Sequence, residues 1–184
     1  MASRVVLASA SPQRRRILEG LGARFDVVAP EVPERDAGDP VDVAVANATA
    51  KARAVAGDLV IGCDTVVATE AGLWGKPRDE VEATRTLEHL SGRTHRVVSG
   101  VAIVRRGQLT TAAETTLVGF RELGAAEIAR YVAKGEWRGR AGGYAIQGAG
   151  VVLIARVEGD LLNVIGLPVG ALLRLVPELR AAAA

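Results

Sequence analysis

Apolar residues in the first third of the chain form short runs that alternate with segments of helical character. Strands are expected at residues 5–8, 24–29 and 59–63, and the last is a continuous apolar run, typical of a strand buried on both faces. Helices are expected at 12–21 and 41–56, the second so rich in alanine that it can pack close to a sheet. This order predicts strand–helix–strand units.

The remainder of the chain adds an antiparallel part. β-Branched residues fill two stretches separated by Arg105-Arg106-Gly107-Gln108, which predicts an antiparallel pair of strands. The expected elements are a hairpin turn at 69–72, a helix capped by Asp79 and running to Leu90, strands at 94–104 and 109–120, a helix at 125–133, a buried strand at 151–157 and a last helix ending near Leu179. The predicted fold class is α/β with a mixed sheet.

Composition limits the class of protein. The chain has 184 residues, 49% of them hydrophobic, and neither a repeat nor a long linker, so we expect one domain over 1–184, divided into two lobes by a cleft. A net charge of +2 and 3% aromatic residues do not favour nucleic-acid binding. The sequence has no signal-peptide pattern and no run that could span a bilayer, so a cytoplasmic location is expected.

The few thiol and imidazole groups exclude several kinds of site. Cys63 is the only cysteine, which rules out a disulfide framework and a cysteine-based metal site. His89 and His95 are the only histidines, too few for a multi-histidine zinc centre. Cys63 is expected in the core, and His95 is expected to have a structural or hydrogen-bonding role.

The segment from Val5 to Leu18 has the features of a phosphate-binding loop. Ser11 is a suitable N-cap and Pro12 a suitable first helical residue. Three arginines, Arg14 to Arg16, occupy the first turn, where the helix dipole already favours negative charge. A strand, a serine loop and a basic helix start together indicate an anion site. A solvated basic helix face is an equally good interpretation of this segment alone.

Four further charged residues stand out by their context. Asp64 follows the apolar strand, where open α/β sheets place their ligands, and a functional role is favoured over a capping role. Lys51 lies on a largely apolar helix, where a lysine usually reaches out to solvent and less often binds phosphate. Lys76 lies on a rigid Gly75–Pro77 turn. Glu34 lies in a charged loop that, taken alone, looks like a solvated connector.

A glycine-rich segment completes the set. Residues 135–150 include six glycines among sixteen residues, which indicates sharp turns or a close approach to a ligand. Two acids can hold one Mg²⁺, three cations can clamp a polyphosphate, and Thr65 and Gln147 can hydrogen-bond a base edge. The set therefore predicts metal-assisted hydrolysis of a nucleotide.

At these residues the sequence resembles the Maf family of nucleoside triphosphate pyrophosphatases, once described as septum-formation inhibitors. The resemblance covers nearly the whole chain, and the order and spacing of its motifs are specific. Those motifs are Leu7-Ala8-Ser9-Ala10-Ser11-Pro12, Lys51-Ala52, Gly62-Cys63-Asp64-Thr65, Gly75-Lys76-Pro77, Leu90-Ser91-Gly92-Arg93-Thr94-His95, Ala141-Gly142-Gly143-Tyr144-Ala145-Ile146-Gln147-Gly148 and Val164-Ile165-Gly166-Leu167-Pro168. The resemblance implies a strongly twisted mixed sheet flanked by helices, similar to inosine triphosphate pyrophosphatases.

The resemblance also implies an activity: cleavage between the α- and β-phosphates, giving a nucleoside monophosphate and pyrophosphate. The implied catalytic residues are Asp64, as proton acceptor, with Lys51 and Lys76 on the triphosphate. Glu34 and Asp64 would hold Mg²⁺ or Mn²⁺. The implied substrate-binding residues are Ser9, Ser11, Gln13, Arg14, Thr65 and Gln147. A homodimer is common in the family, so it is a possible assembly here.

One departure bears on the substrate. Thr65 and Gln147 match the family branch that acts on dTTP and UTP, but Gln13 stands where that branch carries arginine. We therefore expect a broader or altered base preference. Arg14 is the arginine assigned to phosphate, whereas Arg15 and Arg16 are expected to face solvent.

Two other classes of function remain as alternatives. One is a non-catalytic, nucleotide-binding regulator of cell division. The other is a nucleic-acid-binding module built on the arginine cluster, which the low aromatic content and near-neutral charge make the weaker hypothesis.

Overall fold

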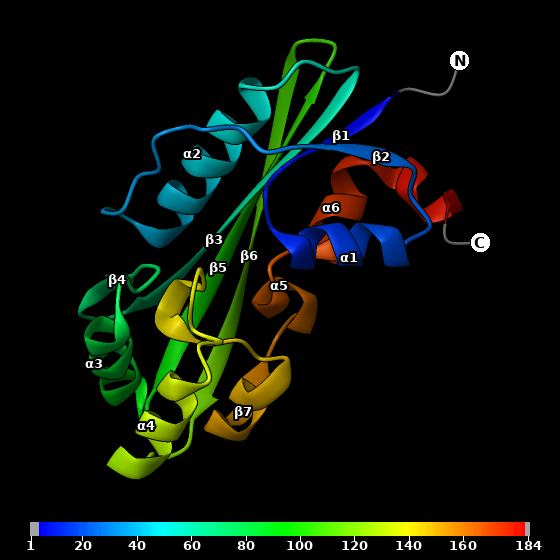
Figure 1. Ribbon diagram of the computed structural model, residues 1–184. Coiled ribbons are helices and arrows are strands. Elements are labelled where there is room, and N and C mark those ends of the chain that lie inside the picture. Colours follow the sequence, from blue (N-terminus) through cyan, green and yellow to red (C-terminus); the bar gives the residue numbers. More distant parts are fainter. Residues whose placement is uncertain (1–3, 183–184) are drawn as a thin grey trace.

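A seven-stranded mixed sheet runs through the whole molecule in the computed structural model, which describes residues 4–182 (Figure 1). The strands are β1 (Val5–Ala8), β2 (Phe25–Val28), β3 (Leu59–Thr69), β4 (Gly72–Trp74), β5 (Thr94–Arg105), β6 (Gln108–Phe120) and β7 (Ile154–Glu158). Their order is β2-β1-β3-β5-β6-β7, with β4 paired to β3. The β2-β1-β3 pairs are parallel and the others antiparallel, which confirms the predicted mixed α/β class.

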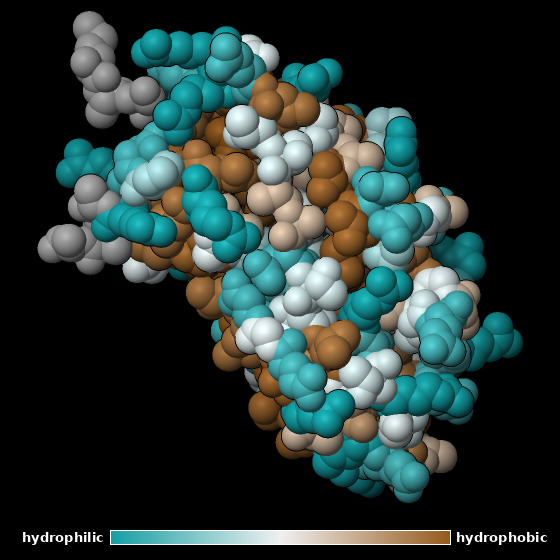
Figure 2. Space-filling view, turned by 180° about the vertical axis from the view of Figure 1, so that it is seen from behind, coloured by the Kyte–Doolittle hydropathy of each residue, from teal (hydrophilic) through white to brown (hydrophobic). Residues whose placement is uncertain are grey.

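Helices cover the sheet in two lobes (Figure 1). They are α1 (Pro12–Gly20), α2 (Pro40–Arg53), α3 (Glu80–Leu90), α4 (Ala125–Ala133), α5 (Leu161–Ile165) and α6 (Val169–Leu175), with 3₁₀ turns at Ala141–Gly143, Gly148–Leu153 and Pro177–Ala182. In the first lobe, α1 and α6 pack on one face of the sheet and α2 on the other. In the second lobe, α3 and α4 pack against the far ends of β3, β5 and β6. Seen from behind, polar and apolar residues are interleaved over the surface (Figure 2).

Successive residues of β3 face different helices, as the pleat requires. Ile61 and Cys63 pack in the core beneath α1 and α6, while Val60 packs beneath α2. Cys63 is therefore a core residue, as expected, and burial raises the pKa of its thiol. The same alternation turns Asp64 toward α2, where Lys51 and Asn47 contact it, and Thr65 toward α1, where Arg14 contacts it.

The approach of α2 to the sheet depends on glycine. A Cβ at Gly62 on β3 would overlap the Ala48 carbonyl oxygen of α2, and one at Gly100 on β5 would overlap the Ala44 carbonyl. The alanine-rich helix thus lies directly on two glycines, closer than ordinary side chains would permit. This close approach brings the polar side chains of α2 down to β3.

Three expectations about the elements are wrong. The strand expected at 59–63 continues to Thr69, so Asp64 lies inside a long strand and not at its end. Residues 148–153 form a 3₁₀ turn with exposed Val151 and Val152, and the expected strand starts only at Ile154. The last helix ends at Leu175 because Pro177 cannot continue it, and a 3₁₀ turn follows. The helix α5, capped by Asp160 and ended by Gly166, was not expected.

His95 has the structural role expected of it. Its ring is 1% exposed, lies edge-on to Phe120 and Tyr144, and pairs through Nε2 with the Tyr144 hydroxyl at 2.8 Å. Burial lowers the pKa of His95 to about 4, so the ring is neutral at pH 7. Within residues 4–182 no helix combines the length and apolarity needed to cross a membrane.

The packing of α2 predicts that Gly62→Ala destabilises the fold. The added methyl group must push α2 off the sheet, which should cost at least about 2 kcal/mol and lower Tm by about 4–8 °C. Gly20→Ala is the matched control, because nothing lies within 4 Å of a Cβ there and alanine favours the helix. Thermal unfolding of both variants measures the difference. Equal Tm values would contradict the close approach.

Candidate active site

A cleft of about 710 Å³ lies between the two lobes, and β3 passes through it. It contains every residue that the sequence singled out for a site. Those ten residues are Ser9, Ser11, Gln13, Arg14, Glu34, Lys51, Asp64, Thr65, Lys76 and Gln147. They come from loops and elements far apart in the sequence, so the fold brings the whole set together.

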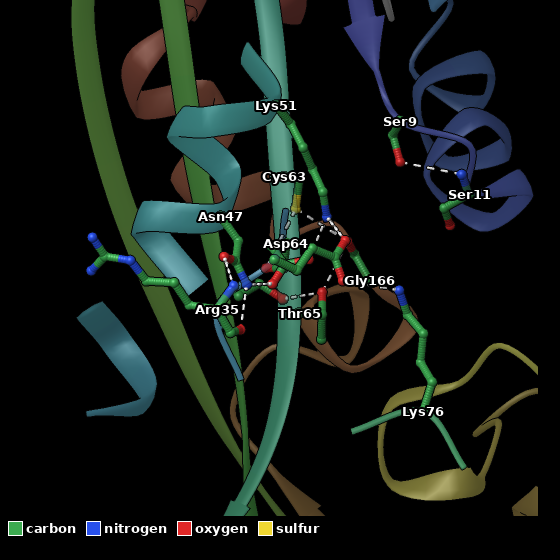
Figure 3. Close-up of polar contacts among 12 residues, drawn as sticks. Ser9, Ser11, Arg35, Asn47, Lys51, Cys63, Asp64, Thr65, Lys76 and Gly166 are labelled. Atoms are coloured by element: carbon green, nitrogen blue, oxygen red, sulfur yellow. Dashed lines mark hydrogen bonds and ion pairs between the residues drawn. The ribbon is translucent and has the colours of Figure 1, made fainter. Parts of the chain in front are cut away.

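The Lys51 ammonium group is the centre of the polar contacts (Figure 3). Its Nζ lies 2.6 Å from Asp64 Oδ1 and 2.6 Å from Glu34 Oε1, and its side chain is only 10% exposed. Partial burial alone raises the pKa of Glu34, but the hydrogen bond and charge of Lys51, aided by Lys76, outweigh burial and hold that pKa below its usual range. Glu34 is therefore ionised at pH 7 and belongs to the site, not to a solvated connector.

Asp64 receives a second donor on its other oxygen. The amide of Asn47, one turn before Lys51 on α2, donates from Nδ2 to Asp64 Oδ2 at 3.0 Å. The two donors from one helix face fix the plane of the carboxylate, and its remaining lone pairs are open to the cleft. A carboxylate held in this way can accept a proton from a bound water.

Arg14 is buried against the loop that the serines form. Its Nε donates to the Gly166 carbonyl at 2.8 Å, Nη1 to Ser9 Oγ at 3.1 Å and Nη2 to Thr65 Oγ1 at 3.1 Å. A guanidinium has five N–H donors, so two remain for an anion in the cleft. Ser11 caps α1 by accepting from the Arg14 backbone N–H, as expected.

The Thr65 hydroxyl group belongs to this network as well. It accepts from Arg14 and shares a hydrogen bond of 2.8 Å with the Ser99 hydroxyl on β5. Ser99 is fully buried, so the pair joins β3 and β5 beneath the cleft.

Lys76 lies on a turn that the glycine-rich segment holds. The Gly75 carbonyl accepts from the Gly142 N–H at 3.0 Å, and Gly143 lies so close to Pro77 that a Cβ would be 3.0 Å from the proline ring. Lys76 Nζ reaches Glu34 Oε2 at 3.4 Å, with half of its side chain exposed. It is therefore the more accessible of the two lysines.

Gln147 is exposed on the wall formed by the second lobe. Its loop is fixed by the carboxylate of Glu136, which accepts from the Ala149 N–H at 2.9 Å. Gly148 takes a positive φ of 84° directly against that carboxylate. Gln147 thus projects from a rigid loop.

Some residues of the cleft were not predicted from the sequence. Arg138 and Arg140 line the same wall as Gln147, but their glycine-rich segment drew attention only to its glycines and Gln147. The alternation of arginine and glycine at 138–140 was the available signal. Arg15 and Arg16 are exposed, as expected, and Arg15 pairs with Glu19, but Arg16 also lines the cleft.

The two carboxylates fit a divalent cation. Glu34 and Asp64 each place an oxygen 2.6 Å from one ammonium nitrogen, so both reach a common cation position. Mg²⁺ takes carboxylate oxygens and usually keeps waters or substrate phosphates as its other ligands. Residues 4–182 contain no group of three or more acidic, histidine or cysteine side chains suited to a metal.

Comparison with known proteins extends over nearly the whole chain. The family model described as Maf-like protein matches residues 4–179. A dTTP/UTP pyrophosphatase of Syntrophotalea carbinolica is 46% identical over 176 residues, which cover 90% of this chain and 80% of the relative. Proteins of the same name are 43% identical over 180 residues in Deinococcus radiodurans, covering 95% and 92%, and 40% identical over 184 residues in Pyrococcus furiosus, covering 94% of each.

The ion-pair geometry predicts that Lys51→Met lowers the stability of the apo protein but increases the stabilisation gained from Mn²⁺. Without the ammonium, two carboxylates face each other, which should cost about 3 kcal/mol and lower Tm by about 6–12 °C. Mn²⁺ should then raise Tm more in the variant than in the parent, because no lysine competes for the oxygens. Differential scanning fluorimetry with and without Mn²⁺ measures both effects. The exposed Lys134→Met is the control, and equal Mn²⁺ shifts in all three proteins would be evidence against competition.

Proposed function

This chain belongs to the Maf family, and from that premise we propose that it hydrolyses nucleoside triphosphates to a nucleoside monophosphate and pyrophosphate. The relatives named dTTP/UTP pyrophosphatase support this reaction at a phosphoric anhydride bond. The observation that carries the proposal is the convergence of Asp64, Glu34 and three cations in one cleft between the lobes. Removal of unwanted nucleotides from the cellular pool is the role this activity would serve.

In the proposed mechanism each charged residue has a separate task. Arg14 offers its two free N–H groups to the triphosphate from the serine loop, and Lys76 approaches it from the opposite lobe. Asp64 accepts the proton of a water that attacks the α-phosphorus, and pyrophosphate leaves with the electrons of the broken P–O bond. Mg²⁺ or Mn²⁺ on Glu34 and Asp64 would polarise a phosphoryl oxygen. Lys51 leaves its carboxylates for a phosphate oxygen.

We assign recognition of the base to Thr65 and Gln147, which line the same cleft. Gln13 also lines the cleft, with its Oε1 accepting from the Ser11 hydroxyl at 3.2 Å. Its amide N–H₂ group therefore remains available to a substrate. The relatives' name supports dTTP and UTP, whereas Gln13 supports a broader or modified set of substrates.

The assembly, the cellular location and the nucleic-acid binding of the protein are further parts of the proposal. A homodimer, a cytoplasmic location and the absence of stable nucleic-acid binding stay predictions. The alternative function, a regulator of cell division that binds nucleotides without turnover, differs in one observable. Calorimetric binding of dTTP without release of pyrophosphate after long incubation with Mg²⁺ or Mn²⁺ would favour the regulator.

Asp64→Asn should abolish most of the pyrophosphate release from dTTP or UTP. The amide keeps the size of the side chain but cannot accept the proton, so kcat should fall by about 10²–10⁴-fold. A coupled pyrophosphate assay with Mg²⁺ measures the rate. Asp36→Asn, an exposed acid outside the cleft, should retain the parent rate. Parent-like turnover by Asp64→Asn would show that the assigned role is wrong.

Gln13→Arg should narrow the base preference. An arginine has a full charge and no acceptor, so the relative kcat/KM for dTTP and UTP over other triphosphates should rise by about tenfold. A panel of common and modified triphosphates measures this ratio. Arg15→Gln, which changes an exposed neighbour, should leave it unchanged. A parent protein that is strictly specific for dTTP and UTP, with no change in Gln13→Arg, would count against the assignment.

A further inference from the structure

We propose that Asn47 is a positioning residue that ties the segment carrying Glu34 to Asp64 and so sets how the two carboxylates face each other. The inference rests on the proposed function for its catalytic consequence, but its structural part can be tested without it. No motif drew attention to Asn47, which appears in the sequence only as a polar residue on an alanine-rich helix.

The amide of Asn47 uses three of its four hydrogen-bonding positions, including both donors. Oδ1 accepts from the Arg35 backbone N–H at 2.7 Å, and Nδ2 donates to the Arg35 carbonyl at 3.0 Å and to Asp64 Oδ2 at 3.0 Å (Figure 3). The side chain is 3% exposed. The Arg35 N–H needs an oxygen as acceptor and the Arg35 carbonyl needs an N–H₂ donor, so these two partners fix which way the Asn47 amide is turned. A buried amide with three such partners is costly to replace.

The segment that Asn47 holds has little other support. Residues 29–39 connect β2 to α2 without helix or strand. Among the described residues, the backbone of residues 30–38 makes two hydrogen bonds, and both join Arg35 to Asn47. Glu34 precedes Arg35 directly, and its carboxylate ends on Lys51. The two hydrogen bonds between Asn47 and the Arg35 backbone, here called the clasp, therefore fix the position of the backbone from which the Glu34 side chain extends.

Asn47 and Lys51 act from the same face of α2, one turn apart, on the two oxygens of one carboxylate. The lysine contact is ionic and is open to competition from a metal or a phosphate. The amide contact is neutral, so it persists when Lys51 leaves. Asn47 thus keeps Asp64 oriented during turnover, which predicts an effect on kcat and on metal affinity rather than on triphosphate binding.

Substitutions at Asn47 and at Arg35, which are in contact in the fold, distinguish the effect of losing the clasp from the effect of losing a nearby side chain. Asn47→Leu keeps the branched outline and the number of heavy atoms of the side chain and removes all three hydrogen bonds. Arg35→Ala removes a side chain that points away from Asp64 (Figure 3) but keeps the backbone N–H and C=O that Asn47 contacts. Arg35→Ala is therefore the matched control. Asn47→Asp, which has the shape of the native residue but lacks both donors, is a second test variant.

The experiment combines amide hydrogen exchange of the apo protein, Mn²⁺ titration followed by electron paramagnetic resonance, and steady-state pyrophosphate release. In Asn47→Leu the Arg35 amide should exchange about tenfold faster, as expected for one lost hydrogen bond, whereas Asn47→Asp keeps the oxygen that accepts from this amide and should leave it protected. In Asn47→Leu, Mn²⁺ affinity and kcat should each fall by about 10–100-fold, with KM for the triphosphate within about twofold of the parent. In Asn47→Asp the new carboxylate repels Asp64, so kcat should fall as well. Arg35→Ala should match the parent in all three measurements.

Each contrary result overturns the proposal. A folded Asn47 variant with parental Mn²⁺ affinity and kcat would show that the clasp does not position the carboxylates, and a rise in KM alone would assign Asn47 to substrate binding. If neither variant folds, the parent decides: an Arg35 amide that exchanges as fast as those of its neighbours excludes the clasp. A parent without pyrophosphate release refutes the proposed function, while exchange and Mn²⁺ affinity still test the positioning role.

Discussion

A single buried ammonium group, that of Lys51, holds the site together. It lies 2.6 Å from one oxygen of Glu34 and 2.6 Å from one oxygen of Asp64, and burial makes such contacts stronger than they would be in water. Removing the lysine leaves two carboxylates opposed, so the three residues must be present together. In the proposed mechanism the ammonium would hold the two carboxylates in place until a metal binds, because it satisfies oxygens that the metal would otherwise bind.

The position of this ammonium group follows from the packing of the first lobe. Helix α2 reaches β3 and β5 only because Gly62 and Gly100 leave room for its backbone. The pleat of β3 then turns Asp64 toward α2 and Thr65 toward α1, so successive residues of one strand line the cleft from its two faces. The second lobe contributes Lys76 and Gln147 on loops fixed by glycines and by Glu136. Local stereochemistry in several separate elements thus produces a single charged cleft.

Much of this could be predicted from the sequence, and the failures have physical causes. Helix caps at Ser11 and Asp79 are local signals, and both are confirmed. The length of β3 was missed because Asp64 and Thr65 interrupt its apolar pattern, whereas their partners on α1 and α2 make polar residues tolerable inside a strand. Val151 and Val152 have the β-branched side chains typical of a strand, but both are exposed in a 3₁₀ turn, and the glycines that precede them prevent a strand there. No local sequence pattern marks Asn47, because its role depends on contacts with Arg35 and Asp64, which lie next to it only in the folded chain.

We propose that this cleft splits a triphosphate between its α- and β-phosphates. Phosphorus-31 NMR of dTTP or UTP incubated with the full chain and Mg²⁺ tests the claim most directly, because it identifies the bond that breaks. We expect nucleoside monophosphate and pyrophosphate in equal amounts, with no nucleoside diphosphate at any time. Nucleoside diphosphate with inorganic phosphate, or an unchanged triphosphate across a panel of bases, would contradict it.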